Sequence, residues 1–75
     1  MTPALNDIRI CVTDTTPAEI VAIGFGAAAE ARAAQAARER HVAVNVLIPK
    51  DGFDLAAKIS PSGMRVDVGN ALRAP

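Results

Sequence analysis

The chain has 75 residues with eight basic and eight acidic side chains, so its net charge is zero and no global field favours nucleic acid or an anionic membrane. One cysteine and one histidine are too few for a disulfide framework or a metal cluster, and only two residues are aromatic. We therefore expect a single small domain over residues 1–75, without metal or cofactor, whose marginal stability is helped by self-assembly or by a partner.

The two ends of the chain, residues 1–7 and 70–75, are expected to be flexible. The N-terminal residues lack the basic and apolar segments of a signal peptide. No apolar run reaches the ~20 residues that a membrane span needs. The expected location is therefore cytoplasmic.

Residues 8–13 alternate between apolar and other side chains, which is typical of a half-buried strand. Cys11 lies in this strand between two large apolar residues, where a cysteine is usually a small core residue. A second interpretation makes Cys11 a nucleophile, if His41 and an acid approach it in space.

The stretch from Thr16 to His41 permits two interpretations, and the first is one long alanine-rich helix from about Pro17 to Arg40. Thr16 fits the N-cap, Pro17 the first helical position and Glu19 the third, which together form a capping box. We favour this interpretation. The expected apolar stripe of the helix is Ile20, Ile23, Gly24, Ala27, Ala31 and Ala34.

The second interpretation makes Glu19–Ile23 a strand, followed by a turn and a helix that starts near Ala27. The segment Gly24-Phe25-Gly26-Ala27-Ala28-Ala29 then resembles the dinucleotide-binding βαβ unit of the Rossmann family. The resemblance implies that Gly24 and Gly26 line the phosphates of a nucleotide or flavin. It also implies that Ala29 sets close helix–strand packing and that residues 41–48 form the second strand.

A further resemblance is to the dodecins, small flavin-binding proteins that assemble as dodecamers. It depends on Thr16-Pro17 at the start of a helix, the glycine pair within it, and Ala31-Arg32-Ala33-Ala34-Gln35. The aromatic residue that stacks on flavin in that family has no counterpart in this chain. The resemblance therefore implies self-assembly and no particular site.

The second half of the chain predicts three strands, at residues 42–48, 53–59 and 64–68, joined by turns. A short helix over residues 54–59 is the rival interpretation. The predicted fold class is α+β, in the order β-α-β-β-β, with one mainly antiparallel sheet and the long helix across one face. The other face is expected to carry Arg9, Cys11, Ala43, Asn45, Leu47 and Ala56, and its apolar members indicate an interface.

Function is expected to be non-enzymatic: a module that binds a larger protein complex or assembles with itself. Phage or mobile-element inhibitors of host defence complexes, such as anti-CRISPR proteins, share this size and plain composition. The alternatives are a nucleotide- or flavin-binding protein using Gly24, Gly26 and Ala29, and a nucleic-acid adaptor using the basic helix end. The residues expected to bind a partner are Arg32, Arg38, Arg40 and His41.

Overall fold

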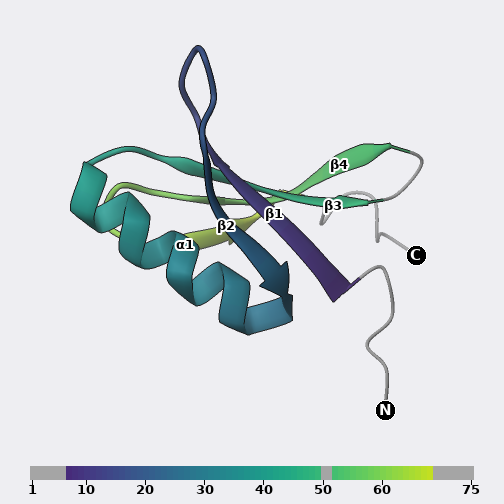
Figure 1. Cartoon of the computed structure of the whole chain (residues 1–75). Coiled ribbons are helices and arrows are strands. Elements are labelled where there is room, and N and C mark those ends of the chain that lie inside the picture. Colours follow the sequence, from purple (N-terminus) through teal and green to yellow (C-terminus); the bar gives the residue numbers. More distant parts are fainter. Residues whose placement is uncertain (1–6, 50–51, 69–75) are drawn as a thin grey trace.

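The computed structural model describes residues 7–49 and 52–68 of the chain. These residues form five strands and one helix (Figure 1), in the order β-β-α-β-β-β. The elements are β1 (Ile8–Thr13), β2 (Ile20–Phe25), α1 (Gly26–Arg40), β3 (Val44–Pro49), β4 (Phe53–Ile59) and β5 (Arg65–Asp67).

The strands form one sheet in the order β2-β1-β3-β4-β5, and each neighbouring pair is antiparallel. Helix α1 lies across one face of this sheet, as Figure 1 shows. The predicted class, α+β with a single helix on an antiparallel sheet, is therefore confirmed. The strand order places β2 and β5 at the two edges.

The predicted long helix from Pro17 to Arg40 is wrong, because its first third is an extra strand, β2. Residues Ile20–Ile23 include three β-branched side chains, which favour extended backbone. Gly26 has a φ of +52°, a left-handed conformation that cannot lie inside a right-handed helix. Glu19 does not complete a capping box with Thr16, since its carboxylate pairs with Arg40 at 3.0 Å.

The segment between β1 and β2 is instead the loop of a hairpin, which extends beyond the rest of the sheet (Figure 1). It contains the cis peptide bond between Thr16 and Pro17. At the base of the loop, the main-chain amide of Glu19 donates to the buried Thr13 hydroxyl at 2.8 Å. This bond satisfies the buried hydroxyl group.

The second interpretation described the local structure correctly, with a strand, a glycine turn and then a helix. The expected nucleotide-binding unit does not follow from it. Strands β2 and β3 are both antiparallel to β1, which lies between them. The adjacent parallel pair that the Rossmann resemblance implies is therefore not formed by the described strands.

The core lies between α1 and the sheet and is made largely of small side chains. Ala29, Ala33 and Ala37 of α1 are fully buried, which corrects the stripe expected from the long helix. Cys11 is also fully buried. The face of β1 that carries Cys11 therefore packs against α1, although the sequence predicted that this face would be open. The sheet contributes Cys11, Ala22, Val44, Val46, Ala57 and Ile59 to this core.

The remaining strands agree with the prediction except at their ends. Residues 53–59 are strand β4, not a helix, while β3 and β5 begin later than expected. Of the expected flexible ends, only residue 7 falls within the described residues. In the described part of the chain, no helix combines the length and the apolar character needed to cross a membrane.

Candidate protein-interaction face

The face of the sheet turned away from α1 carries large apolar side chains on every strand. Cross-strand partners share a face, so the register identifies its members. Ile10 lies opposite both Ile23 and Leu47, and Phe25 lies opposite Ile8. We call this surface the open face; its apolar members are Ile8, Ile10, Val12, Ile20, Ile23, Phe25, Leu47, Phe53, Leu55 and Val66.

Many of these side chains are accessible. Seven large apolar residues among those described keep between 42% and 66% of their surface exposed. Five of the seven are members of the open face, namely Ile20, Ile23, Phe25, Phe53 and Val66. A contiguous apolar surface of this kind is uncommon on a protein that works alone in water.

The open face contrasts with the face under α1. Helix α1 contributes only alanines to the buried residues there, and the sheet adds Cys11, Ala22, Val44, Val46, Ala57 and Ile59. The core is thus rich in alanine, while both phenylalanines and several other large apolar side chains lie outside it. Burial would stabilise the large side chains most, so this distribution indicates a second partner for the sheet.

The edge of the sheet beside this face is partly closed. Strand β2 is an edge strand, and the guanidinium group of Arg32 on α1 donates from Nη2 to the carbonyl of Ile23 at 2.8 Å. This bond occupies a main-chain acceptor that a further strand could use. The side chains of the face, more than the strand edge, are thus available for contact.

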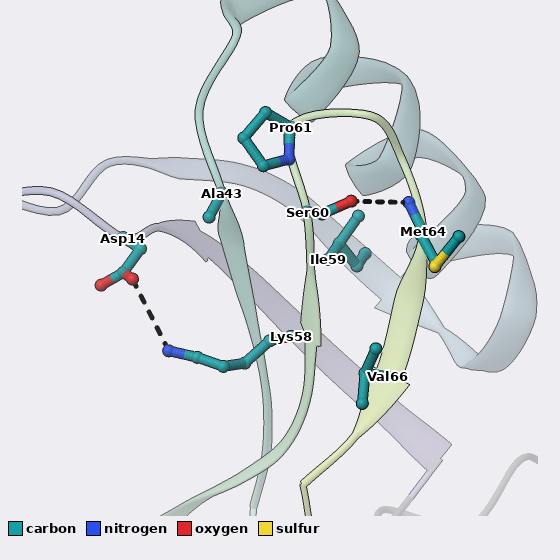
Figure 2. A pocket seen from close by; sticks show the side chains of 8 residues that line it. All are labelled: Asp14, Ala43, Lys58, Ile59, Ser60, Pro61, Met64 and Val66. Carbon is teal, nitrogen blue, oxygen red and sulfur yellow. Dashed lines mark hydrogen bonds and ion pairs between the residues drawn. The ribbon is translucent and has the colours of Figure 1, made fainter.

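A pocket of about 360 Å³ lies where the open face meets the β4–β5 turn, as Figure 2 shows. Asp14 and Lys58 form an ion pair of 3.6 Å at its rim. The walls are largely apolar and include Met64 and Val66, two of the exposed residues. Nearby on the open face, the buried Oδ1 of Asn45 has no hydrogen-bond partner among the described residues.

A charged cluster lies on the covered side of the sheet. Glu30 of α1 accepts hydrogen bonds from Arg9 of β1, at 3.1 Å, and from Arg65 of β5, while Arg65 also pairs with Asp67 at 2.7 Å. Partial burial lowers the pKa of Arg65, but its bonds to Glu30 and Asp67 outweigh that effect and raise it. Sequence reasoning missed this cluster, because Glu30 of α1 and Arg65 of β5 are 35 residues apart in the sequence.

The four basic residues expected to bind a partner do not form one patch. Arg32 contacts β2, and Arg40 pairs with Glu19 at the start of β2. Arg38 lies on the other side of the helix, against Gly63 in the β4–β5 turn. His41 is exposed and ends α1 in a left-handed conformation. Their role in binding stays a prediction.

The three residues of the alternative ligand site do come together. A Cβ atom built on Gly24 would lie 3.5 Å from Cβ of Ala29 and 2.7 Å from Nη2 of Arg32. The contact with Ala29 would have an ordinary van der Waals length, so Gly24 leaves room for the Arg32 guanidinium group, whereas Gly26 supplies the left-handed turn into α1. Each glycine thus has a structural role, and nucleotide or flavin binding here stays a prediction.

Cys11 has the environment of a core residue. Burial, reinforced by the charge of Glu30, raises the pKa of its thiol to about 11. Such a thiol is protonated at neutral pH and a poor nucleophile. Within residues 7–49 and 52–68, no three His, Cys, Asp or Glu side chains are grouped to hold a metal ion.

Comparison with known proteins gives no family for this chain. No protein-family model matches its sequence, and no curated protein or solved structure is significantly similar to it.

Proposed function

We propose that this chain is a non-enzymatic protein-interaction module that binds through the open face of its sheet. The observation that carries the proposal is the placement of Ile20, Ile23, Phe25, Phe53 and Val66 outside a core that is rich in alanine. Such a face is stabilised when another protein surface covers it, at roughly 25 cal/mol per Å² of apolar surface.

The character of the face supports a protein partner in preference to a small molecule or nucleic acid. Its central residues, among them Ile10, Ile23 and Leu47, form an apolar surface on neighbouring strands. The lysine on this face, Lys58, is already paired with Asp14, so the face offers little charge to phosphate groups. Inhibitors of larger complexes, such as anti-CRISPR proteins, are one class of small protein that acts by surface contact alone, and the proposal includes that role.

The proposal is tested with two matched lysine substitutions. Ile23→Lys places a charge on the open face, where Ile23 is 55% exposed, and Ala31→Lys places the same charge on the exposed side of α1. Tagged chains are recovered from the native host, and the stoichiometry of any bound protein, including further copies of the chain, is measured. Circular dichroism confirms that each variant is folded.

We expect the wild type and Ala31→Lys to hold the same protein at the same stoichiometry, and Ile23→Lys to lose at least nine-tenths of it. Loss of binding in Arg38→Glu, with full binding in Ile23→Lys, would instead place the interface at the basic helix end. That result would overturn the proposal.

A further inference from the structure

We infer that the open face binds a second copy of this chain, face to face, so that the two sheets form a sandwich with one helix on the outside of each sheet. This inference rests on the proposed function and names the partner. The two copies are related by a twofold axis that lies between the sheets and runs across the strands. Such an interface is self-complementary, so each copy supplies the same surface.

The area of the open face fits this partner. Taking about 200 Å² for a large side chain, the exposed apolar residues on and beside the face offer on the order of 600 Å². The half-buried members, such as Ile10 and Leu47, add to this. A stable interface takes about 800 Å² from each partner, so one copy of the same face is enough to cover the other.

The charge of the face also fits a second copy. A self-complementary interface cannot tolerate a surplus of one sign, because like charges would meet across the axis. The open face carries Lys58, and Asp14 balances it at the rim of the pocket. Two copies can therefore approach without net repulsion.

The shape of the face sets the orientation. Both aromatic side chains of the chain lie at one end of the sheet, Phe25 opposite the start of β1 and Phe53 opposite the end of β3. The pocket lies at the other end, beside the last residues of β4 (Figure 2). A twofold axis across the strands sets each end against the opposite end of the partner. The exposed Phe53 of each copy then faces the partner's pocket.

The central row of the face lies on this axis. Ile23, Ile10, Leu47 and Leu55 are cross-strand neighbours midway between the aromatic end and the pocket end. Each of these residues therefore meets the same part of the partner. Ile23 of one copy therefore lies near Ile23 of the other, and a single cysteine at this position can test the twofold symmetry by cross-linking.

The first measurement is the mass in solution over a range of concentrations, by analytical ultracentrifugation. We expect twice the 7.8 kDa mass of the chain. Phe53→Ala removes the side chain that enters the pocket and should raise the dissociation constant at least tenfold. The control Ala31→Ser, on the exposed side of α1, should leave it unchanged.

The second measurement is cross-linking of single substitutions to cysteine with a short bismaleimide; the native Cys11 is fully buried and protected from the reagent. Ile23→Cys should give covalent dimers, whereas Ala31→Cys should stay monomeric under the same conditions. Cross-linking of Ala31→Cys but not Ile23→Cys would overturn the inferred arrangement.

A monomeric mass at every concentration would overturn the inference. If the wild type then still holds another protein that Ile23→Lys loses, the open face remains a protein-binding surface with a different partner. If neither self-association nor such binding is found, the proposed function fails as well.

Discussion

Gly24 of β2 and Ala29 of α1 meet across the helix–sheet interface, where a Cβ atom added to Gly24 would lie 3.5 Å from Cβ of Ala29. Small residues continue along α1 at Ala33 and Ala37, both fully buried. The helix therefore contributes only small side chains to this interface, and the larger buried side chains there, Val44, Val46 and Ile59, come from the sheet. The other large apolar residues of the strands occupy the open face.

The first prediction concerns this close packing. Ala33→Leu adds a large side chain to a fully buried site, and we expect it to lower the free energy of unfolding by about 1–3 kcal/mol. Ala31→Leu makes the same change on the exposed side of α1 and should alter stability by less than about 0.5 kcal/mol. Denaturant unfolding of both variants checks this. Equal effects would show that α1 does not pack through Ala33.

The second prediction concerns the turn into α1. Because Gly26 has a φ of +52°, Gly26→Ala should destabilise the protein by about 1–2 kcal/mol. Gly26→Asn should cost less, since asparagine tolerates this conformation better. Inside a continuous helix, Gly26→Ala would instead stabilise by about 1 kcal/mol. The sign of the change in thermal unfolding therefore decides between the strand–turn–helix structure and a long helix.

The third prediction concerns Glu30, which joins α1 to β1 and β5 through Arg9 and Arg65. Its side chain is only 13% exposed, so Glu30→Ala removes charge-assisted bonds from a partly buried site. We expect a loss of about 2 kcal/mol. Glu39→Ala, at an exposed position on the same helix, should cost under about 0.5 kcal/mol. Urea unfolding measures both, and similar losses would contradict a structural role for the cluster.

The fourth prediction concerns the pH dependence contributed by Cys11. Burial raises the thiol pKa from 9.0 to about 11, so the unfolded chain loses this proton first as the pH rises. The stabilisation is fully present below about pH 9 and is lost as the pH rises toward about 11. From this group alone we expect stability to fall by roughly 2 kcal/mol between about pH 8 and about pH 10.5.

Cys11→Ala is the control, because it retains every other titrating group. Its free energy of unfolding should fall less over the same pH range than that of the wild type. Identical pH dependence in the two proteins would show that the thiol is not held in its neutral form by burial.

Periodicity alone predicted much of the sheet. Strand β1 and the extent of β4 follow from alternating apolar residues and turn signals, and the presence of a helix follows from the helical spacing of the alanine-rich stretch. The error at residues 17–25 arose because a capping-box spelling and an alanine-rich sequence both favour a helix. The β-branched residues Ile20 and Ile23 gain more from pairing with β1, and this pairing depends on tertiary structure.

The orientation of β1 could not be predicted either. Alternation separates two faces but does not say which one meets the helix. In the structure, the face of β1 that carries Cys11 is buried in the core with the alanines of α1, and Ile8 and Ile10 lie on the other face. The candidate interface was therefore expected on the correct side of β3, where Leu47 lies, but on the wrong side of β1.

Hydroxyl-radical footprinting of Phe25, Phe53 and Met64 tests most directly whether the open face and its pocket are the interface. These side chains are 50%, 60% and 66% exposed, so we expect rapid oxidation of the isolated chain at high dilution. In the assembled form, concentrated or recovered with its partner, oxidation of all three should slow at least fivefold. Equal rates in the two forms, with protection of the exposed side of α1 instead, would contradict the account.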